Sequence, residues 1–486
     1  MLNNEQTVEK YLTDLFNYSS DVIIEKQYLT NSKETQKMVV VYCNGLTDYT
    51  ILLNTIFPDI QEKYSNYSLK GVEHLNCSMQ MQWSINDQDV DATLLDKVFN
   101  GFTAIVIAQT IYFFNTSDPP KRSLEESNSE VSVRGPRDSF VEDISSNIAL
   151  VRKRIKSNSL VTTSFVIGER SQTKVMLIYL TDIQNKQMIK EVTERLNNIK
   201  IDFLNSDNQL LGFLSDNNFS LFPVLKATSR PDSVVSSLGV GRFAIFMDNS
   251  PNVLIGPANL GLLLKTAEDD HTPYYYATFE IILRLFGLII ALFLPSFWVA
   301  LSSFNADQIP FPLLATVASS RLGIPFNATF EMLLMLFLFE LFREAGVRLP
   351  KAVGQTVSVV GGLIVGSAAI QAGVTSPTML VIASLTAVAT FTLGNQAFYG
   401  TVSILRFSSI FLSSFLGMLG FFISLYVILA YLAKLESFGL PYLSPISPFV
   451  KKDFFKSILR FPAVKQDERA SILNPIDKDK QGDKGN

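Results

Sequence analysis

The sequence has few of the residues that most often build catalytic or metal centres. Its 486 residues include two cysteines, two histidines and two tryptophans, and its apolar second half has no histidine. It also lacks a phosphate-binding glycine loop, a zinc-type Cys/His spacing and a nucleophile elbow. An intramembrane enzyme needs clustered histidines and carboxylates, or a nucleophile with its base. We therefore predict a protein that is not an enzyme and that holds no cofactor and no metal.

A strong excess of one charge is missing, and so is an export signal. The formal net charge of −4 argues against nucleic acid as a partner. Met1–Lys10 is polar and acidic, without the basic start and apolar core of a signal peptide. We therefore expect the first domain to stay in the cytoplasm. Cys43 and Cys77 agree with this, because a reducing compartment leaves thiols free.

Long apolar runs are absent from roughly the first 275 residues and frequent after Thr278. The mean hydropathy of +0.23 is too high for an ordinary soluble protein. The 18% of charged residues is too high for a pure membrane bundle. The sequence therefore predicts a soluble α/β N-terminal region of two subdomains, followed by an α-helical polytopic membrane domain.

The soluble half contains short apolar runs typical of buried strands. In the first subdomain, Met38–Asn44 predicts a strand, Thr47–Lys63 a helix, and Phe102–Asn115 two strands that turn near Ala108 and Gln109. In the second, strands are predicted at Val161–Ile167, Lys174–Leu180 and Phe243–Met247. We expect the first subdomain to cover residues 1–117, a linker or arm 118–138, and the second subdomain 139–272.

The arm is too polar to bury itself. Glu125, Arg134 and Arg137 lie in it, and specific recognition of charge is a natural use for such residues. We expect the arm to dock between the two subdomains or onto a neighbouring subunit. Further along, Asp269, Asp270 and His271 resemble a metal site only superficially, and a solvated charged loop is the expectation there.

Five runs in residues 278–433 are candidate membrane segments: Ile281–Ser302, Ala328–Arg343, Val353–Ile370, Thr378–Leu393 and Ile404–Leu432. Ile309–Ser320 is too short to span and predicts a re-entrant or interfacial piece. Five crossings would place residues 434–486 outside, although that tail is basic and should lie inside. A sixth crossing, through the short segment or by splitting the last run, would restore parity. Five and six both stay open, and the end of the tail is expected to be disordered.

Ionisable residues at membrane depth are expensive, and one predicted helix carries several: Glu331, Glu340, Arg343, Glu344 and Arg348. Helical spacing pairs Arg343 with Glu340 and Arg348 with Glu344, and these pairs would stabilise the end of the helix. Glu331 falls on the opposite side. It must find Arg321, Lys351 or another subunit, or face water, or become neutral, and a functional role is the alternative to a structural one.

The following segment presents a stripe of small residues at helical spacing. Gln355, Gly362, Gly366, Ala369 and Gly373 lie near one line along the helix. Close helix packing is one interpretation. The other is a narrow ion passage, with Gln355 and Ser358 as hydrogen-bonding residues at its mouth.

Several longer motifs follow one another in an order that resembles a known family. They are the run from Arg122 to Leu160, GIPF from Gly323, FREAGVRLPKAVGQTVSVVGGLIVG from Phe342, and SFGLPYLSP from Ser437. Together they resemble the A subunits of GerA-family spore germination receptors, over roughly Arg122 to Pro448.

This resemblance implies a subunit of a nutrient-sensing complex in the inner membrane of bacterial endospores. The implied partners are a transporter-like B subunit that binds the germinant and a C subunit that is a lipoprotein, besides membrane lipid. The A subunit is expected to form a homo-oligomer that acts as, or gates, an ion channel. The alternative, a secondary transporter, would show internally repeated hydropathy, and the sequence has no convincing repeat.

Overall fold

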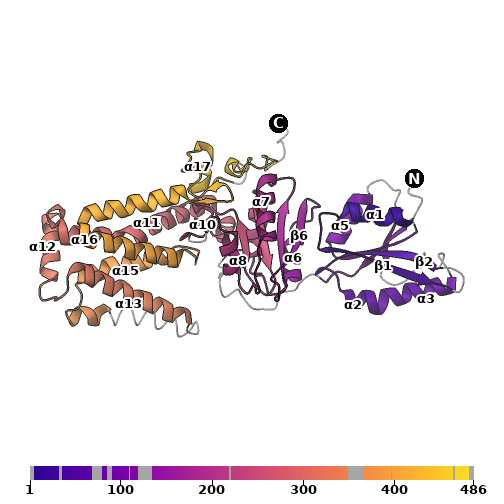
Figure 1. Cartoon of the computed structure of the whole chain (residues 1–486), viewed down its shortest axis with the longest axis horizontal. Coiled ribbons are helices and arrows are strands. Elements are labelled where there is room, and N and C mark those ends of the chain that lie inside the picture. The colour runs from indigo at the N-terminus through magenta and orange to yellow at the C-terminus, as the bar shows by residue number, and fades with distance from the viewer. Residues whose placement is uncertain are drawn as a thin grey trace.

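The chain forms an elongated row of three parts, with the N-terminus at one end and a helical region at the other (Figure 1). The structure, a computed structural model, describes residues 5–31, 35–67, 79–84, 90–108, 110–118, 134–217, 220–348, 366–395, 397–462 and 466–480. We call the first part the first sheet unit (5–118) and the middle part the second sheet unit (134–271).

The first sheet unit is a five-stranded antiparallel sheet with helices on both faces. Helices α1 and α5 cover one face, and the helical stretch from α2 through a π-helical turn to α3 covers the other. The sheet order is β1-β2-β4-β5-β3. The bounds are α1 Glu5–Leu15, β1 Val22–Thr30, β2 Thr35–Cys43, α2 Tyr49–Ile51, η1 Leu52–Ile56, α3 Phe57–Tyr67, β3 Met79–Ser84, α5 Val90–Phe99, β4 Phe102–Ile107 and β5 Thr110–Asn115.

The second sheet unit repeats this arrangement. Its order, β6-β7-β9-β10-β8, again places the third strand of the unit at the edge beyond the fifth. Helices α6 and α9 cover one face, and α7 and α8 the other. The bounds are α6 Ile144–Arg152, β6 Leu160–Ile167, β7 Thr173–Leu180, α7 Lys186–Asn197, α8 Asp207–Leu214, β8 Lys226–Thr228, α9 Pro231–Leu238, β9 Phe243–Met247, β10 Val253–Gly256, α10 Leu260–Leu264 and the 3₁₀ helix η2 Ala267–His271.

Coverage on both faces explains which strands the sequence could predict. All five residues of β9 are buried, so the strand is a continuous apolar run rather than an alternating one. The predicted strands at Val161–Ile167, Lys174–Leu180 and Phe243–Met247 are present, and so is the pair within Phe102–Asn115. The helix predicted at Thr47–Lys63 is present as α2, η1 and α3. Within the described residues every strand pairs antiparallel, so helices and strands mix without parallel crossovers.

A buried ion pair joins the two sheet units. The Arg152 guanidinium donates to both carboxylate oxygens of Asp21, at 2.9 Å from Nε and 2.7 Å from Nη2. The arginine is 0% exposed and also lies over the Phe99 ring. Thr162 donates to the same carboxylate at 2.9 Å. Because neither charge reaches water, the relative position of the units is tied to this contact.

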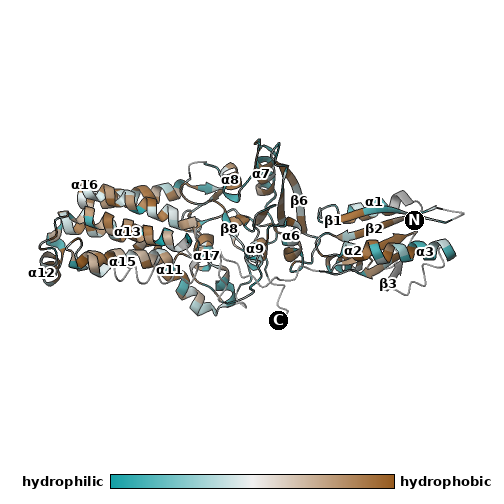
Figure 2. Cartoon of the chain, turned by 90° about the horizontal axis from the view of Figure 1, so that it is seen from below, coloured by the Kyte–Doolittle hydropathy of each residue, from teal (hydrophilic) through white to brown (hydrophobic). Residues whose placement is uncertain are grey.

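The helical region contains α11 Tyr274–Phe304, α12 Phe311–Ser320, α13 Ala328–Arg348, α15 Pro377–Phe391 and α16 Ala397–Lys434, and residues 366–371 are helical as well. Among the described residues, α11 and α16 are long and apolar enough to cross a membrane, and α12 and α15 are shorter apolar helices. Hydrophobic residues dominate this end of the molecule (Figure 2). Most of the predicted segment Val353–Ile370 lies outside the described residues.

Helix α16 is folded back on itself at Gly417, where the backbone (φ 57°, ψ −134°) is not helical. Phe398 near its start and Tyr431 near its end both pack on Phe222, with ring centroids 6.3 and 6.2 Å away. A straight helix would separate these two residues by about 50 Å, at about 1.5 Å per residue. The run therefore forms two antiparallel helices of roughly 20 and 17 residues, each nearly long enough to span a bilayer.

The segment after α16 returns to the second sheet unit. It contains β11 Glu436–Ser437, β12 Leu440–Pro441, α17 Lys451–Ile458 and the 3₁₀ helix η5 Ser471–Leu473. Phe438, Leu440 and Leu473 are buried in the core under α7 and α8. The second sheet unit therefore holds the chain both where it enters the helical region and where it leaves.

Candidate functional site

A fully buried carboxylate, Glu331, lies in the first turn of α13. Asn327 begins this helix, because its side chain accepts a hydrogen bond from the Phe330 amide at 2.8 Å. Glu331 is 0% exposed. Its Oε1 accepts three hydrogen bonds, from Thr375 Oγ1 at 3.1 Å, Ser376 N at 2.5 Å and Ser376 Oγ at 2.6 Å. The negative charge thus lies at the N-termini of both α13 and α15, where helix dipoles favour it.

The second oxygen of Glu331 is less well satisfied. Within the described residues Oε2 has no hydrogen-bond partner, and the nearest cationic atom is Arg321 Nε at 3.9 Å. Arg321 follows α12, so this loose ion pair connects the short helix to α13. Arg321 was one of the partners that the sequence allowed for Glu331.

Glu340 forms a second cluster, nearer the soluble side. It pairs with Arg343 at 2.5 Å and with Arg406 at 2.6 Å, and Ser403 also donates to it. Arg406 is 3% exposed and donates to Thr390 Oγ1 at 3.1 Å. The cluster joins α13, α15 and the first half of α16, and it holds two positive charges against one negative charge.

A small cavity of about 20 Å³ lies at this cluster, lined in part by Glu340, Arg343, Thr390 and Arg406. This volume is enough for one water molecule. The Nε atom of Arg406 has no hydrogen-bond partner in the described part of the chain. The cluster therefore combines excess positive charge with a cavity large enough for one water molecule.

The sequence identified part of this network. Arg343 pairs with Glu340, and Arg348 with Glu344 at 2.7 Å, as helical spacing indicated. The Arg348–Glu344 pair is exposed and contributes little, about 0–1 kcal/mol. Arg406 was not among the residues predicted for this network, although it is buried against Glu340. One signal was available: a lone arginine within an apolar run requires a carboxylate elsewhere.

Only part of the predicted small-residue stripe lies in the described residues. Gln355, Ser358 and Gly362 lie outside them. Gly366 faces α15, since a Cβ added there would be 3.2 Å from the Leu380 side chain. Ala369 accepts the Val374 amide where this helix ends, and Gly373 adopts a positive φ of 66°. In this part of the stripe, Gly366 packs on another helix of the same chain.

The arm is described from Arg134 onward, and Glu125 lies outside the described residues. Arg134 and Arg137 are exposed. Between them Gly135 lies directly against His271, whose ring a Cβ at residue 135 would overlap. The end of the arm therefore contacts η2, the short helix just before α11.

The expectation of a solvated loop at η2 is wrong for Asp269, which is 3% exposed. Its carboxylate accepts two hydrogen bonds from Arg284 of α11, at 2.8 and 2.9 Å, and closes a capping box with Thr266. Arg284 is itself buried and needs this partner, in addition to Glu280 at 3.4 Å. The pair attaches the second sheet unit to the first long apolar helix.

Comparison with known proteins places these features in a family. The family model for the Bacillus/Clostridium GerA spore germination protein matches residues 10–472. The chain is 41% identical to spore germination protein XA of Bacillus anthracis, over 97% of both chains. It is 33% identical to spore germination protein KA of Bacillus subtilis, over 96% of this chain and 86% of that one.

A solved structure is similar as well. It is the N-terminal domain of the A subunit of the Bacillus megaterium spore germinant receptor GerK3, with 26% identity, a TM-score of 0.39, and coverage of 53% of this chain and 95% of that chain. The family match alone spans nearly the whole length of the sequence. The chain therefore belongs to the GerA family of spore germination proteins.

Proposed function

We propose that this chain is the A subunit of a nutrient germinant receptor in the inner membrane of the spore. Its partners there are a transporter-like B subunit that binds the germinant and a lipoprotein C subunit. The observation that carries the proposal is the family match over residues 10–472, supported by two helices apolar enough to cross a membrane. In this role the N-terminal region, with its two subdomains, lies on the cytoplasmic side, which is the core of the spore.

The number of crossings is even in this proposal. The chain enters the helical region from η2 and returns to the core of the second sheet unit through Phe438 and Leu440. A segment that starts and ends on one soluble body must cross the membrane an even number of times. The fold at Gly417 splits the last run into two crossings, and with α11, α13, α15 and the predicted Val353–Ile370 helix this gives six.

We further propose that several copies assemble around an axis and conduct ions. Support comes from Glu331 and the Glu340 cluster, which keep charge at membrane depth at a cost that simple anchoring would not require. The small-residue stripe from Gln355 to Gly373 lines or packs around this axis. Germinant binding elsewhere in the complex would act on the helices through the Asp269–Arg284 pair, which connects soluble and apolar parts.

A spore experiment tests the receptor role. Deleting the gene in a strain without parallel receptors should leave vegetative growth normal and abolish germination on at least one nutrient. Restoring the gene should restore the response. Normal germination of the deletion strain on every nutrient tried would contradict the receptor role.

A flux experiment tests conduction. The protein is reconstituted in liposomes, and ion leak is compared with uptake of labelled solutes, both normalised to the amount of assembled protein. We expect ion leak that Glu331→Gln changes severalfold, whereas the exposed control Glu344→Gln leaves it unchanged. Solute uptake without ion leak would instead support a secondary transporter.

A further inference from the structure

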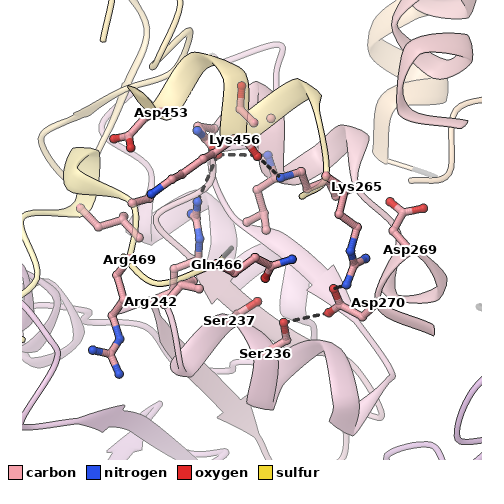
Figure 3. A pocket seen from close by; sticks show the side chains of 18 of the residues that line it. Ser236, Ser237, Arg242, Lys265, Asp269, Asp270, Asp453, Lys456, Gln466 and Arg469 are labelled. Carbon is pink, nitrogen blue, oxygen red and sulfur yellow. Dashed lines mark hydrogen bonds and ion pairs between the residues drawn. The ribbon is translucent and has the colours of Figure 1, made fainter. Parts of the chain in front are cut away.

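A cavity with a volume of about 270 Å³ lies where the second sheet unit meets the C-terminal tail. We call it the junction cavity. Its lining includes Ser236 and Ser237 of α9, Arg242 and Lys265, and residues of the tail such as Lys456 and Gln466 (Figure 3). Ile281 of α11 also lines it. The cavity exists because three separate parts of the chain converge on it.

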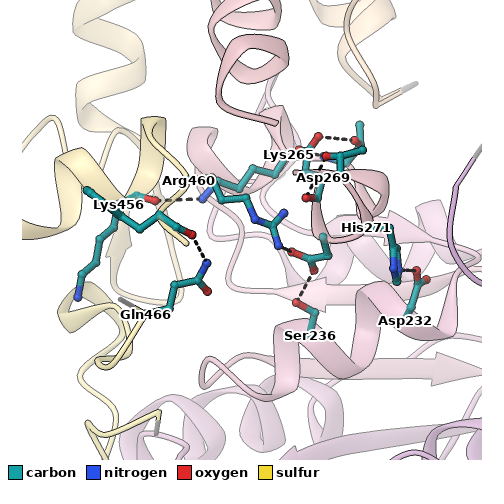
Figure 4. A network of polar contacts seen from close by, with 12 residues as sticks. Asp232, Ser236, Lys265, Asp269, His271, Lys456, Arg460 and Gln466 are labelled. Carbon is teal, nitrogen blue, oxygen red and sulfur yellow. Dashed lines mark hydrogen bonds and ion pairs between the residues drawn. The ribbon is translucent and has the colours of Figure 1, made fainter. Parts of the chain in front are cut away.

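Positive charge dominates its lining. Four carboxylates line it, but each is engaged by another group. Asp269 pairs with Arg284 and Asp270 with Arg460, both at 2.8 Å. Asp453 accepts from Ser471, and Glu468 lies 3.5 Å from Lys456 (Figure 4 shows part of this network). The cations of the lining are Lys226, Arg242, Lys265, Lys456, Arg460, Arg469 and Lys480.

Neither Arg242 nor Lys265 forms an ion pair with a carboxylate of the described part of the chain. Arg242 is 6% exposed. Its terminal nitrogens donate to Pro257 O and to Asn259 Oδ1, and its Nε has no partner among the described residues. Lys265 Nζ reaches a single carbonyl, that of Lys456, at 3.4 Å. Arg242 is thus a buried cation, and Lys265 a half-buried one, that only neutral oxygens contact among the described residues, so both lack a counter-ion.

The pKa values of Lys265 and Arg242 also indicate that these cations lack a counter-ion. Burial lowers the pKa of Lys265 to about 8, and burial alone lowers the pKa of Arg242 to about 10. Asp269 and Asp270 act in the opposite direction on Lys265 but do not outweigh its burial. An anion in the cavity would relieve this cost, because an opposite charge at close range favours the charged form of both side chains.

We propose that the junction cavity binds a small anion through a phosphate or carboxylate group, with Arg242 and Lys265 as its counter-ions. The group could belong to a free solute or to the headgroup of an anionic lipid. Tyr274, Tyr275 and Tyr276 are exposed at the start of α11, which also contributes Ile281 to the lining, and exposed tyrosines at the start of an apolar helix are typical of a membrane interface. Arg242 has a structural part as well, since it holds Asn259, which begins α10.

Binding has a consequence for the tail. One wall of the cavity belongs to the tail, and the Arg460–Asp270 pair closes the wall onto η2. An anion between Lys265 and the tail would therefore stabilise the docked tail, and its departure would loosen the attachment beside α11.

The test uses the full chain purified in a neutral detergent, with inorganic phosphate and succinate as soluble probes. Thermal unfolding is followed across a concentration series of each probe. We expect a saturable rise in Tm and slower proteolysis of the tail. Lys265→Met should weaken the apparent affinity about tenfold or more, as expected for the loss of a charge-assisted contact. Lys190→Met, an exposed lysine of α7, should leave it unchanged.

A second experiment identifies the source of the anion. The same variants are placed in nanodiscs of phosphatidylcholine with or without phosphatidylglycerol. A Tm rise that needs the anionic lipid and disappears in Lys265→Met assigns the site to a headgroup, whereas a rise with the soluble probes assigns it to a solute. Arg242→Gln is a further variant, used only if it folds. If no probe or lipid changes the Tm, or if Lys265→Met responds like the wild type, the proposal is wrong.

Discussion

The two sheet units have the same strand order but different surroundings. The first contacts the rest of the chain chiefly through the Asp21–Arg152 contact and its neighbours. The second shares a hydrophobic core with the helical region, in which Phe222 and Leu260 pack with Leu288 of α11 and Phe398 of α16. The same strand order therefore occurs in two settings. The first unit has its own hydrophobic core, whereas the second unit shares a core with the helices.

The largest expected effect comes from breaking the shared core. Phe222→Ala and Phe113→Ala each remove a ring that is 1% exposed, at a cost of about 4 kcal/mol. Because Phe222 packs on both halves of α16, its loss should lower the amount of protein recovered in membranes. Phe113→Ala should unfold only the first unit. Limited proteolysis of the full chain should then leave the second unit and the helices intact. Degradation of the second unit and the helices along with the first unit would mean that the first unit does not fold separately.

The next effect comes from breaking the contact between the units. Arg152→Met leaves Asp21 buried without its partner and should cost about 3 kcal/mol. The expected result is an earlier thermal transition for the first unit and an unchanged one for the remainder. Arg170→Met is the control, because the Arg170–Asp202 pair is long, at 3.9 Å, and exposed. Equal shifts in the two variants would mean that the buried pair does not fix the junction.

Acid should loosen the same junction. Burial raises the pKa of Asp21, but Arg152 and Thr162 outweigh it and hold the pKa below its ordinary value of 3.8. A depressed carboxyl pKa contributes stability above the unfolded value, and this contribution is lost as the pH falls through the folded value. Unfolding midpoints between pH 7 and pH 2 should fall less steeply below about pH 4 in Asp21→Asn than in the wild type. Parallel curves would contradict this assignment.

The smallest expected effect on stability is that of Gly366→Ala in the helical region. At Gly366 an added Cβ meets only the flexible end of Leu380, so Gly366→Ala should change stability by no more than about 1 kcal/mol. Gly366→Leu should push α15 away and abolish ion flux per assembled complex. Gly400→Ala is the matched control, since its Cβ would meet no atom within 4 Å. Normal assembly and normal flux in Gly366→Leu would exclude a tight contact or a lining role.

The sequence could predict those elements whose pattern lies within one continuous stretch of the chain. The buried strands β7 and β9 are continuous apolar runs and were found. Strand β1 was missed, because its exposed positions make VIIEKQYLT look polar, as suits an edge strand. The burial of Arg406 and the burial of Asp269 were missed. Their partners, Glu340 and Arg284, lie 66 and 15 residues away, and pairing at such separations leaves no periodic pattern.

The return of the tail also determines which helices can move together. Helix α11 begins, and the second half of α16 ends, on the same soluble body, and their side chains pack on each other, as in the contact between Phe297 and Phe421 at 5.3 Å. A rotation of the second sheet unit therefore displaces the first and last helices as one pair. Helices α13 and α15 pack on α11 around Val299, and Glu340 with Arg406 ties α13 to the first half of α16. The boundary between the outer pair and the inner helices is thus the surface along which the region can shear.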